Sequence, residues 1–326
     1  MARGHRKVAS AALSRIAGEL TAAFPLRYIP GHGEEGEEGE NKEEGYQEVG
    51  REEEDGAEGQ EARDLETEAR GRHRLARVPL PVAVVGILAL LPLCASCAVF
   101  ERAGQSWWEL RRDSSSQAPD PATTPEPVVQ VYAARAVGWR GILAVHTWTA
   151  VKRREAPAFT RYEVIGWGVD QGTPAVRVNR MGPDNYWFGA RPELLVELRG
   201  DGVEAIVDKI ESAISAYPYQ DSYLTFPGPN SNTFTAWIGR EVPELGLHLP
   251  PTAIGKDYLP HGLPVGRSPG GRGVQLSLFG LLGVMAGVDE GLELNVLGLV
   301  FGVDVKDPAL KLPFVGRVGT NPPSTR

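Results

Sequence analysis

The sequence of 326 residues predicts an α+β fold in which an antiparallel sheet carries two main helices. Three features support this prediction. From Val128 onward, short runs rich in β-branched and aromatic residues follow one another, which is typical of strands. Asp201 to Ala216 has its apolar residues at helical spacing, and a second helical run opens at Asn230, after two prolines and a glycine.

The chain before this domain divides into three parts. Residues 1–77 are expected to form a cytoplasmic and largely disordered segment, because residues 34–69 carry 17 acidic and 3 basic residues and very few aliphatic ones. Val78 to Phe100 contains no charge and is long enough to cross a bilayer as one transmembrane helix; a buried core helix is the alternative. Residues 101–127 are predicted to be a linker, and the α+β domain is expected to occupy residues 128–326.

The residues that flank the apolar run predict its orientation. Four arginines between residues 70 and 77 precede it, whereas the arginines that follow it alternate with Glu101 and Glu109. This bias predicts a single-pass protein with a cytoplasmic N-terminus and an extracytoplasmic main domain. Cys94 and Cys97 lie inside the run and cannot form a disulfide framework for the domain. Cleavage before Cys97 with lipidation of this cysteine is an alternative to a transmembrane helix. No concentrated basic face predicts nucleic-acid binding, and no motif predicts a cofactor or a metal.

The strands of the domain are predicted on both sides of a charged turn, Lys152 to Glu155. Their β-branched and aromatic content places them at 128–137, 142–151, 160–168, 175–179 and 194–198. The helix that follows is expected to start with Asp201 as its N-cap.

The last part of the domain, residues 274–305, is apolar and punctuated by glycines, which are expected to break it into short segments of mixed type. A second membrane span is not expected, because Asp289, Glu290 and Glu293 interrupt the apolar stretch. A hairpin that packs on the core, or that lies against the membrane surface, fits the pattern better. The polar loop Lys256–Tyr258 precedes this part and is expected to be exposed; a position at the border of the candidate site is the alternative.

A candidate catalytic site combines one histidine with one serine. His146 lies in a strand-like segment, and if Lys152 to Glu155 joins two antiparallel strands, Glu163 is its diagonal neighbour on the same face. A slip of one residue would move Glu163 to the other face. In this arrangement Ser231 would be the nucleophile, His146 the base and Glu163 the residue that orients the base. Backbone N–H groups at Ser231 and Asn232 would supply the oxyanion site.

Each of these residues also has a structural interpretation. Asn230 or Ser231 can cap the helix by accepting hydrogen bonds from its first backbone N–H groups. His146 can be a satisfied core histidine, and Glu163 a paired strand carboxylate. The tryptophans are core residues or, at two positions, line a cleft for a ring or an acyl chain. The predicted substrate-binding residues are Asn230, Asn232, Trp148 and Trp167.

Several motifs occur in order between Pro125 and about Pro313: PEPVVQVYAARAVGWRGILAVHTW, TRYEVIGWG, NYWFG, YPY and PGPNSNTFTAWI. With these motifs the stretch resembles an uncharacterised bacterial family, the domain of unknown function 3750. The resemblance implies a membrane-tethered protein and supplies no reaction.

A strand histidine, His146, is followed much later by Asn230-Ser231-Asn232-Thr233-Phe234 at a helix start. This order is similar to that of the circularly permuted papain-like proteins, which include NlpC-type peptidases and relatives of lecithin–retinol acyltransferase. The resemblance implies a thiol hydrolase or acyltransferase, but Ser231 stands where those proteins have the nucleophilic cysteine. A serine must lose its proton to the base during attack.

Two functions are therefore expected from different classes. The first is a membrane-anchored hydrolase or acyltransferase that acts on amide or acyl bonds of envelope material through Ser231 and His146. The second is a non-catalytic envelope-binding or scaffold domain that keeps the permuted papain-like fold.

Overall fold

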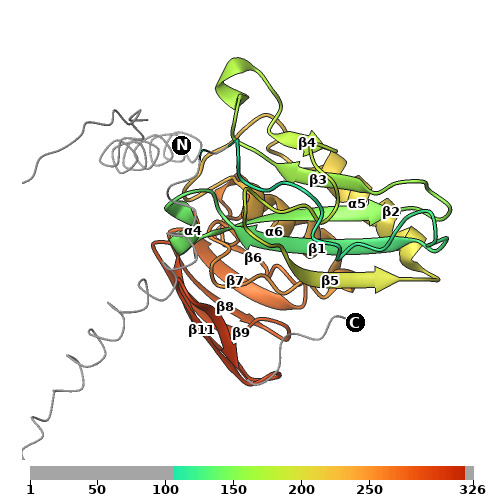
Figure 1. Cartoon of the computed structure of the whole chain (residues 1–326). Helices are drawn as coiled ribbons and strands as arrows, with labels where there is room; N and C mark the ends of the chain where they lie inside the picture. Colours follow the sequence, from blue (N-terminus) through green and yellow to red (C-terminus); the bar gives the residue numbers. More distant parts are fainter. Residues whose placement is uncertain (1–105, 107, 320–326) are drawn as a thin grey trace, which may run out of the picture. The chain divides into compact units, whose positions relative to one another are not determined.

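A computed structural model describes residue 106 and residues 108–319. A five-stranded antiparallel sheet forms the first layer of the domain (Figure 1). Its strands follow the order β4-β3-β2-β1-β5, and each predicted strand lies within one or a few residues of an observed one. The bounds are β1 Val128–Arg135, β2 Val145–Lys152, β3 Thr160–Val164, β4 Val176–Val178 and β5 Glu193–Arg199. A short helix, α4 (Arg140–Leu143), replaces the predicted start of the second strand.

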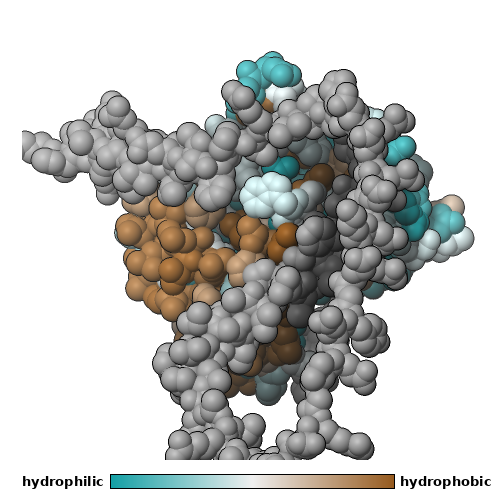
Figure 2. Space-filling model, turned by 60° about the vertical axis from the view of Figure 1, so that its left-hand side comes forward, coloured by the Kyte–Doolittle hydropathy of each residue, from teal (hydrophilic) through white to brown (hydrophobic). Residues whose placement is uncertain are grey.

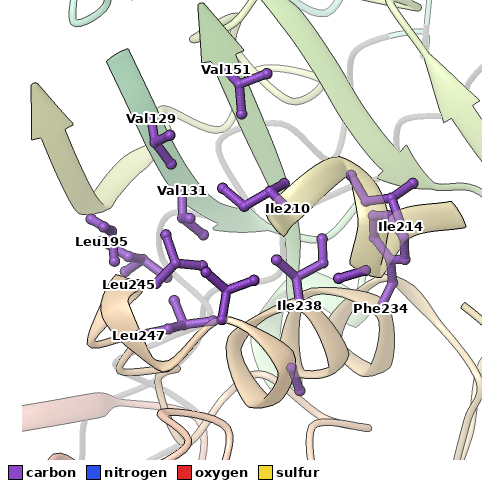
Figure 3. Close-up of a cluster of buried hydrophobic side chains, with 14 of the residues drawn as sticks. Val129, Val131, Val151, Leu195, Ile210, Ile214, Phe234, Ile238, Leu245 and Leu247 are labelled. Carbon is purple, nitrogen blue, oxygen red and sulfur yellow. The ribbon is translucent and has the colours of Figure 1, made fainter. Parts of the chain in front are cut away.

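Two longer helices, α5 (Val203–Ser215) and α6 (Ser231–Glu241), cover one face of this sheet. Figure 3 shows how Val131 of β1, Ile210 of α5 and Ile238 of α6 meet in the core between the layers. The α+β class with two main helices is therefore confirmed. The predicted N-cap of the first helix is wrong, because α5 starts after Gly202, whose left-handed φ of 87° suits glycine, while Asp201 pairs with Arg154.

A second, seven-stranded sheet follows, and it corrects the prediction of mixed short segments for residues 274–305. It is an antiparallel meander in which every strand pairs with its chain neighbours. Its strands are β6 Val265–Arg267, β7 Gly273–Leu278, β8 Leu282–Gly287, β9 Gly291–Val296, β10 Leu299–Asp304, β11 Ala309–Leu312 and β12 Gly316–Gly319. Three short 3₁₀ turns complete the described part, at Val169–Gln171, Pro243–Leu245 and Pro260–Gly262.

The two faces of the seven-stranded sheet have the reverse of the usual polarity. Side chains alternate along each strand, so residues at every second position share a face. The outer face is exposed and apolar, with Val274, Leu276, Leu278, Leu282, Val284, Leu292, Leu294, Val296, Val303, Leu310 and Val318 each 39–59% exposed. The inner face is buried against the body of the domain and carries Gln275, Ser277, Glu293, Asn295 and Lys311.

The chain before β1 also contacts the domain. The backbone N–H of Gln117 and the Ser114 hydroxyl donate to the Asp184 carboxylate at 2.6 Å and 2.9 Å, and Leu110 packs in a cluster with Trp187. Part of the predicted linker, residues 101–127, is thus held on the folded domain. Among the described residues, no helix is long and apolar enough to cross a bilayer. The predicted span from Val78 to Phe100, Cys97 and the acidic segment lie outside the described residues.

Candidate functional site

The start of α6 is closed by its own cap. Asn230 is the N-cap, and its Oδ1 accepts the backbone N–H groups of Asn232 at 3.0 Å and Thr233 at 3.1 Å. Thr233 Oγ1 accepts the backbone N–H of Asn230 at 3.2 Å, which completes a capping box. The N–H group of Asn232, predicted to serve an oxyanion, is therefore already used within the helix start.

The first turn of α6 is also fixed to β2. The amide of Asn232 donates to the carbonyls of Val145 and Ile254 at 3.0 Å and 2.8 Å. The Thr147 hydroxyl lies 3.0 Å from Asn232 Oδ1 and 3.2 Å from the carbonyl oxygen of Ser231. Asn230 and Asn232, both predicted to bind substrate, are buried and have structural partners.

His146 lies on the opposite face of β2 from this helix start. Thr147 points toward α6, so its chain neighbour His146 points the other way. There the Nε2 atom of His146 lies 2.9 Å from Glu163 Oε2, and its ring stacks on Trp187 with centroids 3.8 Å apart. The predicted neighbours His146 and Glu163 therefore meet, because β2 and β3 pair with Trp148 opposite Glu163.

The predicted pair of Ser231 and His146 is not formed, because the five-stranded sheet separates them. The residue of β2 that faces Ser231 is Thr147, which cannot act as a base at neutral pH. Among the described residues the Ser231 hydroxyl has no hydrogen-bond partner, so nothing there activates it. The structure brings together two of the three predicted catalytic residues.

The charges around His146 form a buried set. Arg161 donates from Nη2 to Glu163 Oε2 at 2.7 Å, and its guanidinium lies 4.0 Å from the ring centre of Trp148. Burial alone would raise the pKa of Glu163, but the hydrogen bond from His146 and the positive Arg161 outweigh it and lower that pKa. Burial lowers the pKa of His146, and the Glu163 carboxylate only partly opposes this. The imidazole is therefore neutral near pH 7, and it donates from Nε2 to the carboxylate, which leaves Nδ1 with its lone pair.

Five rings form a stack from the core to the surface. Tyr132 stacks on Trp148 at 5.6 Å, Trp148 on His146 at 5.7 Å, and Trp187 on Trp167 at 6.0 Å with an interplanar angle of 6°. The His146–Trp187 contact joins the two halves. Trp148 is fully buried and cannot line a cleft, whereas Trp167 is 54% exposed at the outer end of the stack.

The sequence did not point to Arg161, Thr147 or Trp187. Arg161 and Glu163 stand two residues apart on one strand, which indicates a shared face, and that spacing could have suggested their ion pair. The position of Thr147 on the other face of β2 follows from the alternation of side chains along a strand, once the face of His146 is known. Trp187 lies in a loop between β4 and β5, so no strand pattern locates it.

A second buried polar cluster lies between α6 and the inner face of the seven-stranded sheet. Glu293 binds two lysines, Lys256 and Lys311, and Lys311 Nζ lies 2.6 Å from Glu293 Oε1. Asp257 accepts from the Asn295 amide at 2.9 Å, and burial raises its pKa. The prediction of an exposed loop at Lys256–Tyr258 is wrong for its two charged residues, which are at most 5% exposed.

No cluster of His, Cys, Asp and Glu within residues 106 and 108–319 could hold a metal ion. No curated protein matches the chain, and no solved structure matches it either, so the permuted papain-like resemblance stays a prediction. A family model matches residues 126–258, which end before β6 and leave the seven-stranded sheet outside the match. The model is described as "Protein of unknown function (DUF3750)", and the predicted resemblance of the chain to that family is therefore confirmed over residues 126–258.

Proposed function

We propose that the chain is a membrane-anchored, extracytoplasmic protein whose domain binds envelope material without catalysis. The observation that carries this proposal is the separation of Ser231 from His146 by the five-stranded sheet. A hydroxyl without a base, at a helix start whose Asn232 N–H is already bound, lacks the activation that a serine nucleophile needs. Instead, the Asn232 amide donates to the Val145 carbonyl and the Ser231 carbonyl accepts from Thr147, and these bonds hold α6 on β2.

The binding surface that the geometry favours is the exposed ring of Trp167. This ring stacks on Trp187 and forms a T-shaped pair with Phe188, so both its orientation and its position are fixed. Arg177 donates to the Trp167 carbonyl at 2.8 Å and holds the backbone there. A rigid, half-exposed indole offers an apolar plane with a polar edge, which suits the face of a sugar ring or an acyl chain.

Covalent labelling tests the non-catalytic part of this proposal. The full chain in its native membranes is treated with a fluorophosphonate probe, with the Ser231→Ala variant as the control. We expect no labelling of Ser231 and unchanged binding to isolated envelope material in the variant. Specific labelling that the variant loses would overturn the non-catalytic assignment.

Binding to isolated peptidoglycan tests the role of Trp167. Loss of one aromatic stacking contact corresponds to about 1.4 kcal/mol, so Trp167→Ala should weaken binding about tenfold. The matched control is Trp139→Ala, because Trp139 is 57% exposed and lies apart from the ring stack. Equal binding by the two variants would exclude Trp167 as the binding surface.

The second candidate function is a hydrolase or acyltransferase that acts on amide or acyl bonds. It is favoured by one observation, the neutral His146 that Glu163 orients through Nε2. In that case His146→Ala abolishes an activity that Ser231→Ala leaves intact, because the nucleophile would come from another group or from water.

A further inference from the structure

The outer face of the seven-stranded sheet is an unusually large exposed apolar surface. Six strand spacings of about 4.8 Å and six residues of about 3.3 Å give a face of about 29 by 20 Å, close to 600 Å². That is the upper end of the largest apolar patch on a typical monomer, before side-chain relief is counted. Figure 2 shows hydrophobic side chains gathered on one side of the molecule. An open groove of about 670 Å³, lined by Val274, Leu276, Val284 and Leu294 among others, crosses this face.

The outward direction of this face is fixed by the charges behind it. Lys311 and Glu293 stand at inward positions of β11 and β9 and are buried against Lys256 of the body. Turning the sheet over would remove these groups from their partners and expose the apolar side chains to the polar interior. The apolar side chains therefore face outward, and no described part of the chain covers them.

The hairpin turns at one end of the sheet extend the apolar surface. Phe279 and Gly280 have φ of 54° and 73° in a three-residue connection, and Leu297 and Gly298 have φ of 53° and 82° in a two-residue turn, so each turn has two successive left-handed residues. Asn or Asp is the usual first residue of such turns, because a bulky side chain is strained there. Leu297 is nonetheless 63% exposed, and Phe314 in the next turn at this end is also left-handed at 67°. Apolar side chains thus occupy positions where a polar residue would fit the backbone better.

We propose that the outer face docks flat on a lipid bilayer, with its side chains at the boundary between headgroups and acyl chains. The chain outside the described residues favours this occupant. This inference rests on the membrane anchor of the proposed function: Leu110, the first buried residue among those described, lies ten positions after Phe100, the end of the predicted span, so this anchor would hold the domain within about 35 Å of the bilayer. A short tether raises the effective concentration of the face at the membrane.

The composition of the face also favours lipid over a second copy of the chain. Protein interfaces combine apolar contacts with hydrogen bonds across the interface. The outward positions of β7 to β9 are all aliphatic and offer no hydrogen-bonding side chain to a partner. Cations lie at the edges instead: Arg267 is exposed on the same face of β6, and Arg272 and Lys306 flank Asp289 at the opposite end from the apolar turns. These cations suit anionic headgroups around the apolar area.

The sheet edges limit how deep the face can enter. Among the described residues, β6 and β12 each have one unpaired edge, and unpaired backbone groups are not tolerated in the hydrocarbon core. The backbone therefore stays at headgroup level while side chains such as Leu294 reach the acyl chains.

Fluorescence quenching by spin-labelled lipids tests this placement in the full chain. Both natural cysteines are replaced, by Cys94→Ser and Cys97→Ser. One new cysteine per variant, Leu294→Cys or Leu276→Cys, then carries the pyrene probe. The protein is reconstituted in nanodiscs of phosphatidylcholine and phosphatidylglycerol with nitroxide on the acyl chain. Val178→Cys is the matched control, because Val178 is equally exposed, at 50%, but lies on the five-stranded sheet.

We expect nitroxide lipids to quench a probe at either outer-face position at least about twofold more strongly than a probe at position 178. Equal quenching at all positions overturns the proposal. Pyrene excimers at position 294 without lipid quenching would instead assign the face to a second copy. Protection from both lipid and aqueous quenchers without excimers would assign it to a segment of the same chain. In either case bilayer docking fails.

Discussion

Neutralising Glu293 should destabilise the domain strongly, because Glu293 is the anion between two fully buried lysines. Its side chain is 2% exposed, and those of Lys256 and Lys311 are 0% exposed. Both lysines lower the pKa of Glu293 against the effect of burial, so the carboxylate is charged in the folded state. Glu293→Gln keeps the shape of the side chain but removes the carboxylate that the two buried lysines share.

Removing one partner of a buried ion pair costs about 3–5 kcal/mol of unfolding free energy. For a domain of about 200 residues this corresponds to a fall in Tm of about 6–20 °C. Thermal unfolding of the full chain in detergent, followed by near-UV circular dichroism, measures the change. The control is Glu244→Gln, which breaks the exposed pair with Lys209 and should cost at most about 1 kcal/mol.

A triple variant sharpens the same test. Lys256→Met, Glu293→Leu and Lys311→Met together replace the buried charges by apolar side chains of similar size. Replacement of a whole buried ionic group is often neutral or stabilising, so the triple variant should recover most of the loss seen in Glu293→Gln. The reasoning is refuted if the single variant loses less than about 1 kcal/mol, or if the triple variant is no more stable than the single one.

Three further predictions concern other parts of the domain. Burial and, after it, the positive Lys311 lower the pKa of His248 to about 3. As the pH falls below about 6.5, His248 therefore binds a proton in the unfolded chain but not in the folded one, and stability is lost. His248→Asn should flatten this pH dependence of the unfolding free energy in unfolding curves at pH 4–7. Asn230→Ala removes the cap of α6 and should lower the unfolding free energy by about 1–2 kcal/mol in denaturant titrations. Ser231→Ala is the control and should change the unfolding free energy by at most about 0.5 kcal/mol. Equal losses in the two variants would contradict the capping role of Asn230. Burial and, to a lesser degree, Arg161 lower the pKa of His146, so Arg161→Gln should raise that pKa in an NMR titration, and an unchanged value would show that the guanidinium does not act on the ring.

The five-stranded sheet could be predicted because its signals are local. The charged residues Lys152 to Glu155 mark the end of β2 and the start of its connection to β3, and counting outward from that turn gives the register that brings His146 to Glu163. The face on which the pair lies could not be predicted in the same way. Alternation says that His146 and Thr147 point in opposite directions, but the chain alone does not say which of them α6 covers. The predicted pairing with Ser231 failed on that choice.

The seven-stranded sheet was missed for a related reason. The stretches around Leu276 and Leu294 do alternate apolar with polar residues, as strands do, but the glycines between them suggested broken segments of mixed type. The inward position of Glu293 depends on Lys256 and Lys311, which are distant in sequence. Charged residues are rarely buried unless they are paired, and the pairing is visible only in three dimensions.

The two sheets differ in how far apart their paired residues stand along the chain, which bears on the order of folding. Pairing of β1 with β5 joins residues about 60–70 positions apart, whereas the widest pairs in the meander, Gly273 with Gly287 and Leu282 with Val296, span 14 positions. Local pairings form faster than distant ones, so the meander can assemble rapidly once it is synthesised. It is also the last part of the described chain to leave the ribosome, and its inward charges need the already folded loop at Lys256. Until that loop is in place, a quickly formed sheet would present its aliphatic face without its buried charges being paired, which exposes the chain to aggregation.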